Sequence, residues 1–258
     1  MRRLAFVLLA ICSSVTSGCL SLEQTMTFEK NLSGTAGVKM QVDLEPIAGF
    51  MAMAKSSMSG KPGKPSEADL AAARQELMES MGKRMSIDLE QAKKEAVAQL
   101  PAGVKLLDAT LKEDGLKSTV GMLIGFDHAS KLEKIALKKD PGAAEVLVDN
   151  PMDQPFGGLK ITDEGKTILV TSPARNPMAE QKDELAQMPM DAELKALFDA
   201  MFSGIRVVVK LTAPFDVVEH NAHRREGSTL VWDYNMTSLM KMSAAEVEQG
   251  VRVRYRKQ

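Results

Sequence analysis

Pairs of alternating segments joined by short turns constrain the fold of this chain more than any other feature of its sequence. Residues 38–44 alternate apolar with polar side chains, and the segments 104–112 and 116–126 flank a Glu113-Asp114-Gly115 turn. Alternation with a period of two is typical of a strand that buries one face, and Gly in a short connection favours a tight hairpin. The sequence therefore predicts an antiparallel sheet rather than a doubly wound parallel one.

The same pattern recurs along the chain and predicts about ten short strands. The opening hairpin spans 23–44, and another hairpin places 159–162 beside 167–171. A fourth hairpin is expected to join 215–220 to 228–234 across a turn near 224–227. Single strands are expected at 205–211 and 251–255.

Helical spacing separates these hairpins. In residues 46–100, apolar side chains recur every three or four positions in three stretches, and Ser66 followed by Asp69 resembles a capping box. A second helical insertion is expected at 178–203, with shorter helices at 127–138 and 237–247. We therefore expect one α+β domain, residues 19–258, in which a curved antiparallel β-sheet built from hairpins has helices packed on one face.

The first residues are typical of an export signal. Two arginines precede the apolar run 4–11, which is too short to span a bilayer. Small residues then lead through Gly18 to Cys19, as in the lipobox of bacterial lipoproteins. We expect residues 1–18 to be a signal peptide and Cys19 to be lipidated; a plain cleaved signal or a retained anchor is the alternative.

Cysteine count and charge narrow the function classes. The only other cysteine, Cys12, would leave with the signal, so no thiol remains for a disulfide, metal or redox site. The formal net charge of −1 gives no basic excess, which argues against a nucleic-acid partner. We expect an exported protein held to the bacterial membrane through Cys19.

Three features together resemble LppM-like bacterial lipoproteins: the lipobox, the hairpin at 104–126 with a helix directly after it, and the closing segments 211–221 and 227–233. The resemblance implies a helix-grip-like fold, in which a sheet wraps a helix and can leave an apolar cleft. It supplies no catalytic residues. Among lipoproteins of this kind, Leu20 rather than Asp after the cysteine favours the outer membrane.

No catalytic motif is present, so we expect no enzyme activity and no cofactor. Glu219, His220 and His223 are candidate metal ligands, but a solvated loop explains them better and we expect no metal. Asp127 beside His128 resembles an acid–base pair, although an N-cap is the better explanation for Asp127.

Methionine is abundant, with 18 residues. The candidates to line an apolar site or a partner surface are Met51, Met58, Met78, Met81 and Met85. An ordinary helix core is the main alternative, and Cu(I) binding by the thioethers is a weaker one.

Basic residues alternate along the closing strand. Arg252, Arg254 and Arg256 are candidate contacts for anionic head groups. The alternative is a charged edge strand that discourages aggregation.

Two functions follow from these patterns. The first is a non-enzymatic envelope lipoprotein that binds lipid or another apolar ligand between sheet and helices. The second is an assembly lipoprotein that binds a protein partner through the Met-rich helices of 46–85. An envelope hydrolase with a site assembled from distant residues is a third hypothesis.

Overall fold

The structure is a computed structural model that describes residues 19–58, 65–82, 89–135, 156, 158–174 and 202–257. Within these residues, eleven strands form two sheets, and five α-helices and one 3-10 helix accompany them. The predicted α+β fold, with antiparallel hairpins and accompanying helices, is confirmed.

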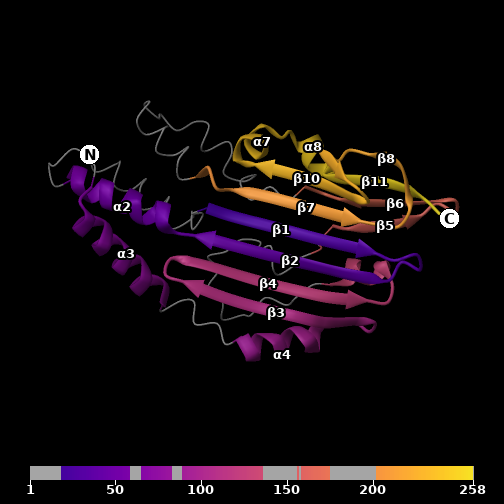
Figure 1. Cartoon of the computed structure of the whole chain (residues 1–258), viewed down its shortest axis with the longest axis horizontal. Helices are drawn as coiled ribbons and strands as arrows, with labels where there is room; N and C mark the ends of the chain where they lie inside the picture. Colours follow the sequence, from indigo (N-terminus) through magenta and orange to yellow (C-terminus); the bar gives the residue numbers. More distant parts are fainter. Residues whose placement is uncertain are drawn as a thin grey trace.

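The larger sheet has seven strands (Figure 1). In spatial order they are β3 (Val104–Asp114), β4 (Lys117–Phe126), β2 (Gly34–Asp43), β1 (Cys19–Phe28), β7 (Arg206–Thr212), β10 (Thr229–Asn235) and β9 (Arg224–Glu226). The hairpins β1–β2 and β3–β4 are those predicted from alternation. The pair β1–β7 is parallel, and it joins the N-terminal and C-terminal halves of the sheet.

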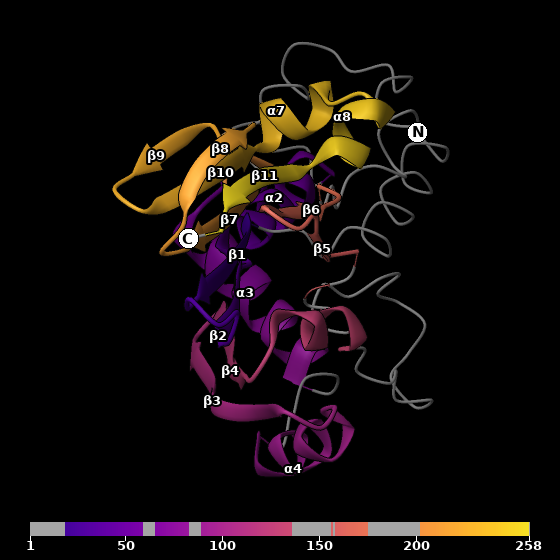
Figure 2. The same cartoon turned by 90° about the vertical axis from the view of Figure 1, so that its right-hand side faces the viewer.

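The smaller sheet is antiparallel and has four strands. Their order is β5 (Lys160–Asp163), β6 (Thr167–Ser172), β11 (Val251–Arg256) and β8 (Asp216–His220). Figure 2 shows this sheet on one side of the larger sheet, beside β10, β7 and β1. The main core lies between the two sheets and includes the fully buried side chains of Trp232, Leu211 and Val253.

Helices lie at the ends and margins of the sheets. The hairpin of α2 (Glu45–Met58) and α3 (Glu67–Gly82) has a small core of its own around Ala48, Ala52 and Ala73. The other helices are α4 (Leu89–Gln99), η1 (Ala129–Lys134), α7 (Met236–Lys241) and α8 (Ala244–Gln249). No helix in the described ranges is both long and apolar enough to cross a bilayer.

Three local predictions are corrected. The predicted pairing of 215–220 with 228–234 is wrong, because β8 pairs with β11 while β10 pairs with β7 and β9. The N-cap of η1 is His128 rather than Asp127, since the His128 ring accepts a hydrogen bond from the Ser130 amide. The expected helix at 237–247 is two helices, with Ser243 capping the second. The insertion predicted at 178–203 lies almost entirely outside the described residues.

Candidate functional site: an apolar groove beneath α4

An apolar groove runs between α4 and the inner face of β3 and β4, with a volume of about 150 Å³. Side chains from α4 form one wall, and residues within the strands β3 and β4 form the other. The lining residues are Leu89, Ala92, Lys93, Ala96, Leu106, Ala109, Thr110, Leu111, Val120, Gly121 and Met122. Most of these side chains are aliphatic, so the groove favours an apolar occupant.

Small residues on α4 leave this space open. Leu89, Ala92 and Ala96 follow the spacing i, i+3, i+7 and face the sheet. The methyl groups of the two alanines are too short to fill the gap, and no residue of α4 is buried. The adjacent Val97 is turned away and is 54% exposed. The helix therefore roofs the groove without closing it.

An irregularity in β3 shapes the floor. The pairing register of β3 and β4 shifts between Leu106 and Asp108, so Leu107 is an extra residue in the strand. Leu107 is 54% exposed, and its side chain lies close to Gly125. Because of this bulge, Leu106 and Ala109 both line the groove although they are three positions apart.

Among the described residues that line the groove, Lys93 is the only charged one. Its side chain is 33% exposed, and its Nζ lies 3.0 Å from Glu90 Oε1. A lysine can place its methylene stem along an apolar surface and keep its ammonium group in water. The site therefore combines an apolar interior with a cation that can meet an anionic group.

The groove is small. A cavity of roughly 150 Å³ accommodates a benzene molecule, whereas pockets for drug-sized ligands are usually about 300–1,000 Å³. The space therefore suits one ring or a short stretch of an acyl chain, with the remainder of a larger ligand outside.

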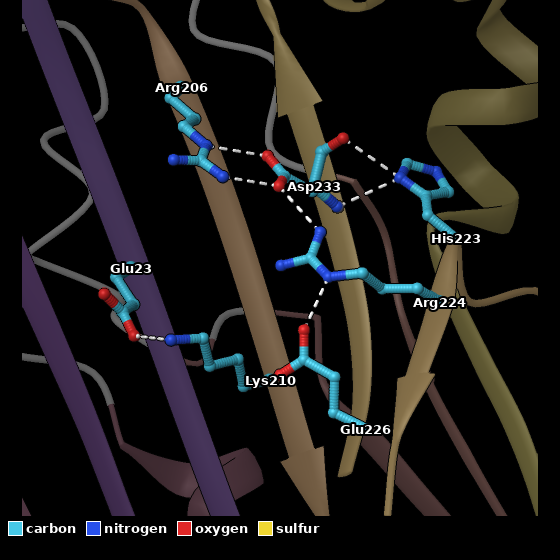
Figure 3. A network of polar contacts seen from close by, with 7 residues as sticks. All are labelled: Glu23, Arg206, Lys210, His223, Arg224, Glu226 and Asp233. Carbon is cyan, nitrogen blue, oxygen red and sulfur yellow. Dashed lines mark hydrogen bonds and ion pairs between the residues drawn. The ribbon is translucent and has the colours of Figure 1, made fainter.

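A network of ion pairs lies on the strands β1, β7, β10 and β9 of the larger sheet (Figure 3). Arg206 on β7 binds both carboxylate oxygens of Asp233 on β10, with Nε–Oδ1 and Nη2–Oδ2 distances of 2.8 and 2.6 Å. Arg224 on β9 reaches the same carboxylate and also Glu226, at 2.8 and 2.7 Å. Nearby, Lys210 pairs with Glu23 at 2.6 Å.

These pairs favour a structural role for Asp233. Hydrogen bonds from Arg206, assisted by Arg224, hold the pKa of its carboxyl well below its usual range. A carboxylate that stays ionised and shared between two guanidinium groups is a poor proton donor at neutral pH. His223 contacts the Asp233 backbone through Nδ1 at 3.0 Å and packs against Tyr234. The network therefore joins β7, β10 and β9.

No described side chain of the Met-rich helices α2 and α3 lines the groove. Met51 packs against the α2–α3 core, and Met78 is 52% exposed instead of lying on a buried face. Met85 and the side chains of Met58 and Met81 lie outside the described residues. The methionine that does line the groove, Met122, comes from β4.

The arginines of the closing strand are mostly paired within the protein. The edge-strand interpretation is wrong, because β11 lies between β6 and β8. Arg254 pairs with Glu164 at 2.9 Å and with Glu219, and Arg252 lies 3.6 Å from Glu219. Arg256 is exposed.

The candidate metal ligands serve local structure instead. His220 Nδ1 accepts a hydrogen bond from the Ala222 amide at 3.1 Å, and Glu219 pairs with the arginines of β11. Within the described residues, no group of three His, Cys, Asp or Glu side chains is placed to hold a metal ion.

The apolar spacing in residues 46–100 predicted a helix here but no site. Leu89, Ala92 and Ala96, which line the groove, were not among the predicted site residues. The signal that distinguishes them is the pair of alanines, because small residues opposite a sheet can leave room for a ligand. Which β3 residues face them depends on the β3 bulge, which no local pattern indicates.

Neither the search of family models nor that of curated proteins found a match for this sequence. Among solved structures, the chain is similar to the folded domain of LppM from Mycobacterium tuberculosis, determined by NMR, with 11% sequence identity and a TM-score of 0.40. The similarity covers 92% of this chain and 90% of that chain. At this level of similarity, the function has to be argued from the residues of this chain.

Proposed function

We propose that this chain is an exported bacterial envelope lipoprotein, anchored to the outer membrane through Cys19, that binds the apolar part of an amphiphile and catalyses no reaction. The observation that carries the binding proposal is the groove beneath α4, which is lined by aliphatic side chains and bordered by Lys93. The anchor rests on the lipobox-like sequence that ends at Cys19.

The size and charge of the groove indicate the kind of ligand. About 150 Å³ is room for a ring or a few methylene groups, and each buried methylene contributes about 0.8 kcal/mol. Lys93 adds attraction for a carboxylate, sulfonate or phosphate. We therefore expect weak, reversible binding of a small anionic amphiphile.

Two substitutions on neighbouring residues of α4 test the binding proposal. Ala96→Phe places a ring in the groove, whereas Val97→Phe enlarges a side chain that points to solvent. Titration with the fluorescent probe 1-anilinonaphthalene-8-sulfonate should show binding by wild type and Val97→Phe. Ala96→Phe should bind about tenfold more weakly, which corresponds to about 1.4 kcal/mol of lost contact. Equal binding by both variants would refute the groove as the site.

A separate experiment tests the anchor. Metabolic labelling with radioactive palmitate in a bacterium that processes lipoproteins should label the wild type, and Cys19→Ser should remove the label. Persistence of the label in Cys19→Ser would contradict lipidation at this residue. Fractionation of the two membranes then tests the outer-membrane assignment.

A further inference from the structure

The α2–α3 hairpin lies at the end of the larger sheet where the proposed anchor begins. Cys19 is the first residue of β1 and pairs with Asp43 on β2, two residues before the start of α2. The Leu44 amide also donates to the Leu116 carbonyl, which ties the start of α2 to the β3–β4 turn. In Figure 1, α2 and α3 project beyond this end of the sheet. The fold thus brings α2 close to any lipid carried by Cys19.

One side of α2 packs against α3. Ala48 and Ala52 are fully buried in the cluster shared with Ala73 of α3, and Ile47 and Met51 are half-buried against the same cluster. Ion pairs between the two helices, Lys55 with Glu76 and Arg74 with Glu45, add to this contact. This packing fixes which side of α2 faces away from α3.

The other side of α2 is apolar and partly exposed. Residues 46–54 contain no charged side chain. At about 100° per residue, Phe50 lies roughly opposite Ala48 and Ala52, and Met53 lies about 60° from Phe50 around the helix. Met53 is 36% exposed, Phe50 is partly exposed, and neither belongs to the α2–α3 cluster. A surface helix normally carries polar residues at such positions.

We propose that this side of α2, with Phe50 and Met53, inserts into the interface of the membrane that holds Cys19 and so orients the domain on the bilayer. This inference rests on the proposed anchoring of Cys19. With a rise of 1.5 Å per residue, Phe50 and Met53 lie about 8 and 12 Å along the axis from Glu45, two residues after the Asp43 that pairs with Cys19.

The bilayer is the favoured partner of this apolar surface because the lipid on Cys19 would hold α2 close to the membrane. A small apolar patch binds a membrane weakly by itself, but a lipid on the neighbouring strand gives it a high local concentration of bilayer. The patch lacks charge, so its contact with the bilayer should depend little on salt or on anionic lipid.

Tryptophan fluorescence on vesicles tests the proposal. The chain from residue 19 contains every described residue and has Cys19 as its single cysteine, so it can be coupled to a maleimide lipid. The vesicles are phosphatidylcholine with brominated acyl chains, which quench nearby tryptophan. The native Trp232 is fully buried and supplies a constant background. Met53→Trp should be quenched on coupling, and its emission should shift to shorter wavelength.

Val218→Trp is the matched control. Val218 is an apolar residue of β8 in the smaller sheet and is 48% exposed. Its tryptophan should be quenched no more than that of the wild type. Phe50→Trp provides a second reporter on α2, and circular dichroism shows that each variant is folded. The proposal would be overturned if Met53→Trp and Phe50→Trp were quenched no more than Val218→Trp. Binding of a protein partner would then be the better explanation for this surface.

The outcomes separate this inference from the proposed function. Coupling is chemical, so the vesicle result does not depend on whether a cell acylates Cys19. Failure of palmitate labelling would overturn the anchor and, with it, the membrane contact in the cell. Absence of quenching on coupled vesicles, with labelling intact, would overturn the α2 contact alone.

Discussion

Asn221 connects the two sheets, and its replacement should reveal how strongly they depend on each other. Its Oδ1 accepts hydrogen bonds from Trp232 Nε1 on β10 at 2.8 Å and from the Arg252 amide on β11 at 2.9 Å. Its Nδ2 donates to the Gly250 carbonyl at 2.8 Å. Asn221→Ala removes all three hydrogen bonds and leaves the indole of Trp232, a fully buried side chain, without this acceptor.

The expected loss follows from these contacts. Three hydrogen bonds at about 1 kcal/mol each would give a loss of about 3 kcal/mol. Asn221 itself is exposed, so water can replace part of what its side chain provides. The indole N–H is less accessible, and an unpaired buried donor costs about 1–3 kcal/mol. We therefore expect Asn221→Ala to lower the free energy of unfolding by about 2 kcal/mol.

Equilibrium unfolding in urea, followed by far-ultraviolet circular dichroism, measures this loss without relying on tryptophan emission. A double-mutant cycle with Trp232→Phe isolates the indole contact. Asn221→Ala should cost about 1 kcal/mol less in the Trp232→Phe background, because the donor is already gone. Strict additivity, or a change below about 0.5 kcal/mol in Asn221→Ala alone, would refute the proposed link between the sheets.

Three further predictions test buried and charged groups. Tyr255→Phe should leave the unfolding free energy unchanged or raise it by up to about 1 kcal/mol, because the buried Tyr255 hydroxyl has no hydrogen-bond partner among the described residues; a clear loss in urea unfolding would contradict this. Gly250→Ala should lower the midpoint of thermal unfolding markedly, because the φ of Gly250 is +37° and a Cβ would lie 2.2 Å from both Ala174 N and Ser172 O. An unchanged midpoint would contradict this expectation. Arg206 depresses the pKa of Asp233, so the difference in unfolding free energy between wild type and Asp233→Asn should be constant above about pH 5 and shrink below about pH 4. Urea unfolding measured from pH 3 to 7 would refute this if the difference grew on acidification.

Contacts between residues close in the sequence were predictable. The β1–β2, β3–β4 and β5–β6 hairpins follow from alternation and from glycine in their turns. The predicted capping pair at the start of α3 is present, with Asp69 N donating to Ser66 Oγ at 3.2 Å. In each case the partners are a few residues apart, so their types and spacing are enough to specify the contact.

The candidate site was less accessible to sequence reasoning. The apolar spacing in residues 46–100 predicted the helix α4, but a stripe such as Leu89, Ala92 and Ala96 looks the same whether it closes a core or roofs a groove. Likewise, the periodicity of α3 does not show that Met78 is exposed. That depends on which side of α3 meets α2, and Ala73 of α3 decides it by packing against Ala48 and Ala52.

The sequence by itself predicted most of the strands and helices of the described residues and the turns of the β1–β2, β3–β4 and β5–β6 hairpins. Only the tertiary structure decided that β8 pairs with β11 instead of β10, that β1 lies parallel to β7, and that a groove separates α4 from the sheet. Alternation states which face of a strand is buried but not which strand lies beside it, because many pairings bury the same side chains. The choice depends on packing between residues far apart in the chain.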